Sequence, residues 1–194
     1  MTTSAFNEHY WESRYLDNNI PWDMGGPSPA LTEYLKSISP KTKILIPGAG
    51  PAWEAQWLEE NGFENIHVID ISEKAVSDAK ERIGPNSSIN WWHGNFFEHA
   101  ESYDLVVEQT FFCALDPEMR NAYAEHMHKI LKPGGRLMGL LFNFPLSADG
   151  PPFGGSIPEY QALFEKHFEI KHLEECYNSI KPRAGREIFI ELIA

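Results

Sequence analysis

The chain has 194 residues, of which 42% are hydrophobic, and a formal net charge of −12. This length and apolar content predict one domain, residues 1–194, with a substantial core. The negative charge, without any Lys/Arg cluster, argues against nucleic acid or an anionic membrane as a partner, because both would be repelled. The sequence has no signal-peptide pattern and no membrane-length apolar run, and Cys113 and Cys176 are too few for a disulfide framework. We therefore expect a cytoplasmic protein whose partner is a small molecule.

The N-terminal segment precedes the first predicted core strand and has an unusual concentration of aromatic residues. Around a Pro/Gly-rich turn it carries Tyr10, Trp11, Tyr15 and Trp22. Segments appended near the carboxyl ends of strands often form lids over ligands. We expect residues 1–36 to form such a lid, together with the Gly/Pro-rich loop 143–155. The alternative is that these aromatic side chains only close the open side of the core.

The next segment predicts the first half of a nucleotide-binding βαβ unit. An apolar strand, 44–47, runs into Gly48-Ala49-Gly50 and a predicted helix, 53–61, and a second strand, 66–71, contains Asp70. The glycines let the backbone approach a ligand, the helix N-terminus offers free N–H groups, and the acid can accept from ribose hydroxyls. Two glycines alone could be ordinary turn chemistry, but the acid after the next strand favours a ligand site.

The third glycine of a dinucleotide motif is replaced here by Trp53. A bulky indole at that position argues against NAD or FAD, whose pyrophosphate needs close packing of helix on strand. S-adenosylmethionine has no phosphates. To bind it, the chain would need only Gly48 and Gly50 for close approach of the backbone and Asp70 for the ribose.

Strands and helices continue to alternate along the rest of the chain. Ser72 can cap a helix over 73–83, and Asp116-Pro117 and Lys132-Pro133-Gly134-Gly135 bracket another. The last two predicted strands have no helix between them, so we expect them to pair antiparallel. This pattern predicts an α/β, Rossmann-like doubly wound sheet of the class I methyltransferase type, mostly parallel with an antiparallel C-terminal strand. The remaining predicted elements are strands 89–93, 103–109, 136–142, 168–174 and 187–193 and a helix over 156–166.

Several loop motifs, taken together, resemble thiopurine S-methyltransferase-like proteins, most closely the halide/thiol methyltransferase branch. The likeness covers nearly the whole chain, and its most specific parts lie in loops, where the fold alone does not dictate the residues. The motifs are Pro21-Trp22-Asp23-Met24-Gly25-Gly26-Pro27-Ser28-Pro29-Ala30, Ile46-Pro47-Gly48-Ala49-Gly50, Ile69-Asp70-Ile71-Ser72, Phe111-Phe112-Cys113-Ala114-Leu115, Leu131-Lys132-Pro133-Gly134-Gly135 and Gly150-Pro151-Pro152-Phe153.

The resemblance implies S-adenosylmethionine as cofactor and a small soft nucleophile, such as a thiol, bisulfide or halide, as methyl acceptor. It assigns no certain catalytic residue. The cofactor-binding residues that it implies are Trp22, Gly48, Gly50, Asp70, Ile71, Asn95, Phe96 and Glu108. The acceptor pocket that it implies is formed by Trp22, Glu108, Gln109, Phe111, Phe112, Phe153 and Arg183.

The chemistry of the implied reaction agrees with these residue types. Transfer of a methyl group from a sulfonium to an anion cancels two charges, so a dry aromatic pocket favours it, and a halide or thiolate needs no general base. The motif loops offer no His paired with an acid. His126 and His128 are two apart on a predicted helix and point to different faces, so we expect no metal site.

Three departures from the family pattern leave alternatives open. Pro51 and Ala52 replace small, flexible residues in the glycine turn, which raises the alternative of a catalytically impaired cofactor-binding protein. Asn95 stands where an acid is common. Gln109 stands where thiopurine-methylating members carry an arginine, which disfavours thiopurine as substrate. A methyltransferase for another small O or N acceptor is a further alternative, and the oligomeric state stays open.

Overall fold

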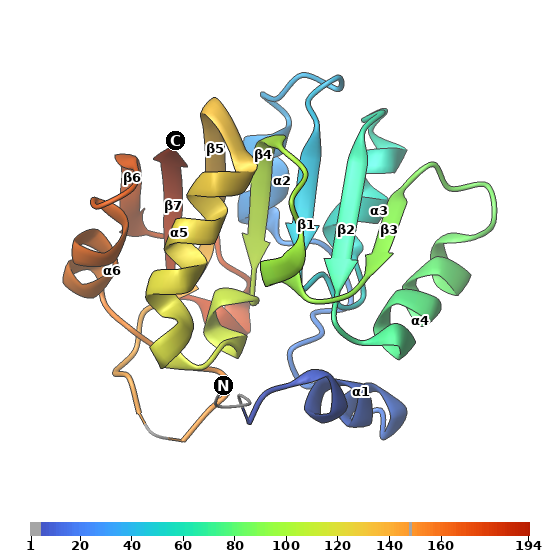
Figure 1. Cartoon of the computed structure of the whole chain (residues 1–194), viewed down its shortest axis with the longest axis horizontal. Coiled ribbons are helices and arrows are strands. Elements are labelled where there is room, and N and C mark those ends of the chain that lie inside the picture. The colour runs from blue at the N-terminus through green and yellow to red at the C-terminus, as the bar shows by residue number, and fades with distance from the viewer. Residues whose placement is uncertain (1–4, 148) are drawn as a thin grey trace.

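A seven-stranded mixed sheet forms the centre of the computed structural model, which describes residues 5–147 and 149–194 (Figure 1). The strand order is β3-β2-β1-β4-β5-β7-β6. β1, β2, β3, β4 and β5 are parallel, whereas β7 pairs antiparallel with both β5 and β6. The predicted sheet and its antiparallel C-terminal strand are therefore confirmed. The strands are β1 (Ile44–Pro47), β2 (Ile66–Asp70), β3 (Asn90–His93), β4 (Tyr103–Gln109), β5 (Leu131–Phe142), β6 (Glu169–Glu175) and β7 (Glu187–Ile193).

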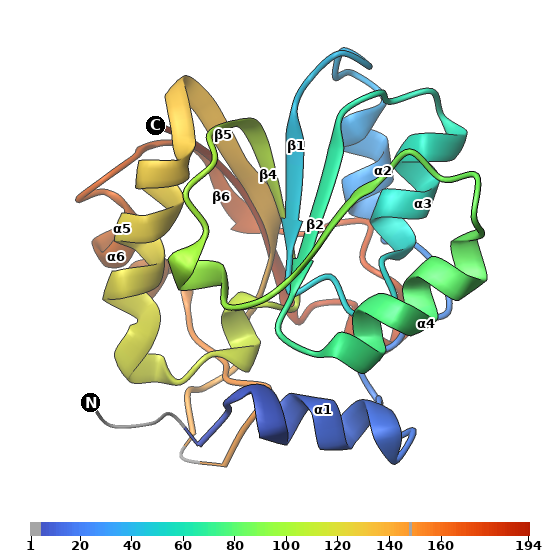
Figure 2. The same cartoon turned by 45° about the vertical axis from the view of Figure 1, so that its right-hand side comes forward.

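Helices cover both faces of the sheet, as Figure 2 shows, and each face has its own apolar cluster. On one face lie α2 (Pro29–Leu35), α3 (Trp53–Glu60) and α4 (Glu73–Ile83), and on the other lie α5 (Arg120–Ile130) and α6 (Ile157–Phe164). Four short 3₁₀ turns complete the described elements: η1 (Phe96–Glu98), η2 (Phe112–Ala114), η3 (Pro117–Met119) and η4 (Lys181–Arg183). Among the described residues, no helix is long and apolar enough to cross a membrane.

Local sequence signals explain most element boundaries. All four residues of β1 are buried, as an interior parallel strand requires. Ser72 caps α4 by accepting a hydrogen bond from the backbone N–H of Ala75 (3.0 Å), and Gly84 ends the helix with φ +103°. β5 starts earlier than predicted, because Leu131 already pairs with Tyr103 before an irregularity shifts the register.

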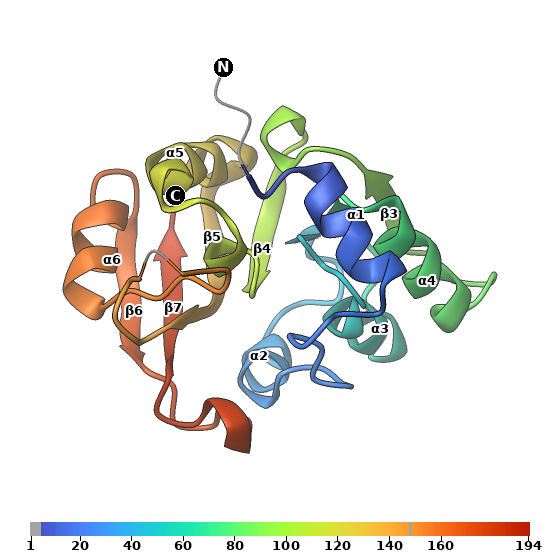
Figure 3. The ribbon, with the colours of Figure 1, turned by 90° about the horizontal axis from the view of Figure 1, so that it is seen from below.

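The N-terminal segment divides into two parts, and neither of its helices was predicted. Leu31 and Leu35 of α2 are fully buried, so this helix belongs to the core rather than to a lid. The first helix, α1 (Glu8–Leu16), buries none of its residues and lies across the end of the sheet toward which β1, β2 and β4 point (Figures 1 and 3). Of the expected lid segments 1–36 and 143–155, residues 1–4 and residue 148 lie outside the described residues.

Candidate cofactor and acceptor site

A pocket of about 990 Å³ opens at the carboxyl ends of the parallel strands. Its walls come from the N-terminal segment, the turn after β1, the end of β2, the loops after β3 and β4, the end of β5 with the loop that follows it, and the η4 region. Sites for small molecules usually measure about 300–1,000 Å³. The pocket therefore has room for a cofactor together with a small second ligand.

The turn after β1 has a left-handed backbone at three alternate residues. Gly48, Gly50 and Ala52 have φ values of +56°, +50° and +55°. A Cβ at Gly48 would lie 2.3 Å from the ring of Phe111, and one at Gly50 would lie 2.5 Å from the hydroxyl oxygen of Tyr15. Close packing therefore requires glycine at both positions. Ala52 adopts the same conformation at a cost of roughly 1–2 kcal/mol, so the turn keeps its shape although this residue carries a Cβ.

Asp70 links this turn to the start of α4. Its Oδ2 accepts a hydrogen bond from the N–H of Gly50 (2.9 Å), and its Oδ1 accepts one from the N–H of Ser72 (2.9 Å). Burial raises the pKa of the carboxyl group, although both hydrogen bonds favour the charged form. A carboxylate offers about four lone-pair sites, so acceptor capacity remains on the side that lines the pocket.

The N-terminal segment contributes Tyr15 and Trp22 to the pocket. The indole Nε1 of Trp22 donates to the hydroxyl of Tyr15 (3.2 Å), and the carbonyl of Trp22 accepts from Arg183 (3.0 Å). Glu12 anchors α1, because its Oε2 accepts from the Ser72 hydroxyl (2.7 Å) and from a backbone N–H of α4. Sequence reasoning placed Tyr15 in the lid but missed it as a pocket residue. Its spacing of four residues from Trp11, one helical turn, was the available signal.

Ten of the residues expected at the site do line this pocket. One of them, Asn95, already uses its side-chain oxygen to accept from the N–H of Phe97 (3.1 Å). Another, Gln109, places its amide Nε2 3.7 Å from the sulfur of Met24, and its Oε1 is buried without a hydrogen-bond partner in the described part of the chain. The ten are Trp22, Gly48, Gly50, Asp70, Ile71, Asn95, Phe96, Gln109, Phe111 and Arg183.

Glu108 does not line the pocket, contrary to the expectation. It is fully buried and lies on the α5 side of the sheet, where its Oε2 accepts from the hydroxyl of Tyr123 (2.6 Å). Its Oε1 accepts from the backbone N–H groups of Phe111 (2.8 Å) and Phe112 (2.9 Å). Successive side chains of a strand point to opposite faces, so only its neighbour Gln109 reaches the pocket.

Two of the expected aromatic residues also lie outside the main pocket. Phe112 is buried in the core, with its ring 4.9 Å from that of Tyr123. Phe153 is turned inward beside Phe6, with ring centroids 5.5 Å apart, and borders a separate shallow depression. From the same loop, Pro151 and Pro152 line the pocket instead.

The histidines considered as metal ligands lie apart from the pocket. His126 is buried with its ring 4.7 Å from that of Phe96, and His128 is exposed with its ring 6.1 Å from that of His167. In the described ranges, no three His, Cys, Asp or Glu side chains are grouped so as to hold a metal ion.

Comparisons with known proteins agree with this geometry. A family model, Thiopurine S-methyltransferase, matches residues 6–191. The probable thiol methyltransferase 2 of Arabidopsis thaliana is 33% identical over 186 residues, which cover 91% of this chain and 81% of the relative. Thiocyanate methyltransferase 1 of Brassica oleracea is 32% identical over 185 residues, with the same coverage of 91% and 81%.

A solved structure supports the fold independently. The magnesium protoporphyrin IX methyltransferase of Synechocystis PCC 6803, crystallised with bound S-adenosylmethionine, aligns with a TM-score of 0.71 at 15% identity and covers 99% of both chains. This likeness shows a class I methyltransferase fold for the present chain.

Proposed function

The chain belongs to the thiopurine S-methyltransferase family and is an S-adenosylmethionine-dependent methyltransferase, and from this premise we propose that its methyl acceptor is a small soft nucleophile: a thiol, bisulfide or halide. The observation that carries the proposal is the combination of aromatic walls with arginines and no histidine among the described residues that line the pocket. The names of the relatives, a thiol and a thiocyanate methyltransferase, support the same acceptor class.

The pocket fits the cofactor. A Cβ at Gly48 or Gly50 would meet a neighbouring side chain, so the turn presents bare backbone, and Asp70 keeps free acceptor capacity for two ribose hydroxyls. Asn95 and Phe96 would meet the adenine, and Trp22 would cover the methionine end. When bound, S-adenosylmethionine supplies an electrophilic methyl group on a sulfonium.

Aromatic side chains of the pocket exclude water and stabilise positive charge. Trp22, Phe111, Phe142 and Phe144 line it from three segments: the N-terminal segment, the loop after β4 and the end of β5. An aromatic face favours a cation by roughly 0.5–2 kcal/mol, and an enclosed site strips water from an anionic nucleophile. These side chains therefore suit the meeting of a sulfonium and an anion.

Arginines give this part of an acidic protein a local attraction for anions. Arg183 and Arg186 line the pocket, with their guanidinium groups 5.5 Å and 4.9 Å from the rings of Phe142 and Phe144. Arg183 is already paired with Glu187 at 3.3 Å, whereas Arg186 forms no ion pair within 4.0 Å among the described residues. Arg186 is thus the freer of the two to attract an anionic acceptor.

Four of the five acids that line the pocket, namely Asp23, Glu54, Asp70 and Asp116, accept backbone N–H groups, and the fifth, Glu118, is exposed to solvent. Asp70 accepts two backbone N–H groups, Glu54 accepts the N–H of Ser28 (2.9 Å), and Asp116 accepts the N–H of Glu118 (3.0 Å). We therefore assign deprotonation of a thiol to solvent rather than to the protein.

The rate with thiols of graded acidity tests this proposal. Between about pH 7.5 and 9.5 the rate with each thiol should rise toward that thiol's own pKa, about 8.5 for a cysteine-like thiol, while the rate with iodide stays nearly flat. A midpoint that is the same for every thiol would reveal a general base on the enzyme. S-adenosylhomocysteine binding without methylation of any thiol or halide would instead favour a binding protein or an O or N acceptor.

A further inference from the structure

We propose that Glu108 is a positioning residue for methyl transfer: its buried carboxylate holds the turn after β4 in the shape that forms one wall of the pocket, and makes the site sensitive to pH. The inference rests on the methyltransferase activity above but not on the identity of the acceptor. Glu108 does not line the pocket, so it acts through the backbone of its neighbours.

The turn that Glu108 holds is strained. Thr110 has φ +60°, a left-handed conformation that is a clear outlier for a β-branched residue and costs roughly 1–3 kcal/mol. Such a conformation persists only where its surroundings fix it. Here the same carboxylate oxygen of Glu108 accepts the next two backbone N–H groups, those of Phe111 and Phe112. These two hydrogen bonds fix the chain directly after the strained residue.

The position of Phe111 links this turn to both halves of the pocket. Its ring covers Gly48 so closely that a Cβ there would lie 2.3 Å away, and its centroid lies 5.1 Å from that of Phe96. The glycine turn and the loop after β3 therefore both contact the ring whose backbone Glu108 holds. Loss of that hold would loosen the wall between them.

No ion-pair partner of Glu108 lies within 4.0 Å among the described residues. On α5 the Tyr123 hydroxyl donates to it, and on the same helix the guanidinium of Arg120 lies over the ring of Phe112 (4.8 Å) and bonds the carbonyl of Gly154. Cys113 of η2 and Tyr160 of α6 are the other titratable groups that face it. From β5, the facing residue is Gly139, which has no side chain.

Burial raises the pKa of Glu108 to about 7, while Tyr123 and the two backbone N–H groups favour the charged form. The ionised carboxylate forms charge-assisted bonds to these groups, which are roughly twice as strong as neutral ones. Protonation below about pH 7 weakens them and so loosens the turn. For folding the sign is opposite, because ionising a buried acid whose pKa is raised costs stability as the pH rises toward 7.

The experiment compares the wild type with Glu108→Gln and Tyr123→Phe between about pH 5.5 and 9. It measures kcat/KM for iodide, which has no proton to lose, and the affinity for S-adenosylhomocysteine by calorimetry. In the wild type both should fall about tenfold as the pH drops through 7, as expected if two backbone bonds lose their charge assistance. In Glu108→Gln, kcat/KM and the affinity should not change with pH and should equal the low values that the wild type reaches in acid. The Tm of this variant at pH 8 should nevertheless be equal to or higher than that of the wild type.

Tyr123→Phe removes a hydrogen-bond donor that favours the charged form of Glu108. The midpoint of the fall in kcat/KM and in affinity should therefore move to higher pH. Tyr160→Phe is the matched control. It removes a bond to the carbonyl of Phe142 (2.7 Å) from the same core but none of the hydrogen bonds to Glu108, so the midpoint of the pH profile should stay the same. Tyr123→Phe also keeps the test decisive if the glutamine variant does not fold.

Full activity of Glu108→Gln at pH 8, an unchanged midpoint in Tyr123→Phe, or a lowered Tm with unchanged pH profile would overturn the proposal. If iodide and thiols are not methylated at all, the acceptor assignment fails by itself. The pH profile of S-adenosylhomocysteine affinity then still decides the role of Glu108.

Discussion

The two ends of the parallel strands handle charge in opposite ways. At the carboxyl ends, Glu54, Asp70 and Glu108 are buried, accept backbone N–H groups and have no ion-pair partner within 4.0 Å in the described part of the chain. Burial raises the pKa of each. At the amino ends, Glu101 and Asp104 are partly exposed and each bonds a lysine at 2.7 Å. The pKa of both these acids lies below its usual value.

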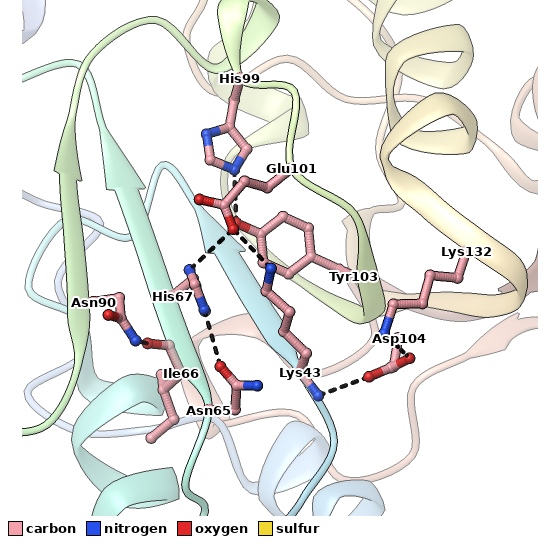
Figure 4. A network of polar contacts seen from close by, with 10 residues as sticks. All are labelled: Lys43, Asn65, Ile66, His67, Asn90, His99, Glu101, Tyr103, Asp104 and Lys132. Carbon is pink, nitrogen blue, oxygen red and sulfur yellow. Dashed lines mark hydrogen bonds and ion pairs between the residues drawn. The ribbon is translucent and has the colours of Figure 1, made fainter.

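Figure 4 shows how the charges at the amino ends connect β1, β4 and β5. Lys43, just before β1, bonds Glu101 through its Nζ and Asp104 through its backbone N–H (2.9 Å), and Lys132 of β5 bonds the other oxygen of Asp104. Tyr103 of β4 shares a 2.6 Å hydrogen bond with His99. Charges at this end are paired and stabilise the fold. At the carboxyl ends, by contrast, acids are buried away from water and the backbone is strained at Thr110, as is common at functional sites.

Removing α1 should produce the largest functional effect. Deletion of residues 1–25 takes away Tyr15 and Trp22 from the pocket, so turnover should be lost because water enters the site. The Tm should fall little, since α1 buries none of its residues. Leu31→Ala in α2 is the contrasting variant: it should cost about 2–5 kcal/mol of stability and leave turnover below its Tm nearly intact. A truncated chain with full turnover would show that α1 is not a lid.

Asp70→Ala and Asp104→Ala compare the two ends directly. The first removes an acceptor for ribose and for the N–H groups of Gly50 and Ser72, so affinity for S-adenosylhomocysteine should fall at least about tenfold, since hydrogen bonds to charged groups contribute about 1.5–3 kcal/mol each. The second should lower the Tm and leave affinity unchanged. Calorimetry and thermal unfolding of both proteins provide the measurement, and equal affinity in both would contradict the ribose assignment.

Most of the core could be predicted from the sequence, whereas two features at the carboxyl ends of the strands, α1 and the position of Glu108, could not. Apolar runs, the Ser72 cap and the glycine turns predicted most strands and helices correctly. In these segments the local sequence signals and the pattern of burial indicate the same element. α1 was missed because it has no buried face and therefore no apolar period. Glu108 was misplaced because β4 is buried on both faces, so Val106 and Val107 are alike and no alternation shows which way the next side chain points.

The smallest expected effect lies at the amino ends, in the pair of Lys43 and Glu101. The side chain of Glu101 is 45% exposed, and exposed ion pairs contribute roughly 0.2–1 kcal/mol. Glu101→Gln should therefore lower the Tm by at most a few degrees, and 1 M salt should remove most of the difference because it screens the pair. Lys43 keeps its second contact, 4.8 Å from the centre of the Tyr103 ring, which limits the loss.

The change in Tm caused by Glu101→Gln should depend on pH in the opposite way to the change caused by Glu108→Gln, which distinguishes the two ends of the strands. The hydrogen bond from Lys43 lowers the pKa of Glu101 in the folded protein, so the contribution is present above the unfolded pKa and is lost as the pH falls through the lower, folded value. The Tm difference between wild type and Glu101→Gln should thus be constant from about pH 6 to 8 and vanish in acid. Glu108→Gln should behave in the reverse sense and gain stability relative to the wild type as the pH rises toward 8, because it removes a charge that burial disfavours. If both variants lost stability with rising pH, the buried acids at the pocket would be stabilising the fold, and the contrast between the two ends of the sheet would not hold.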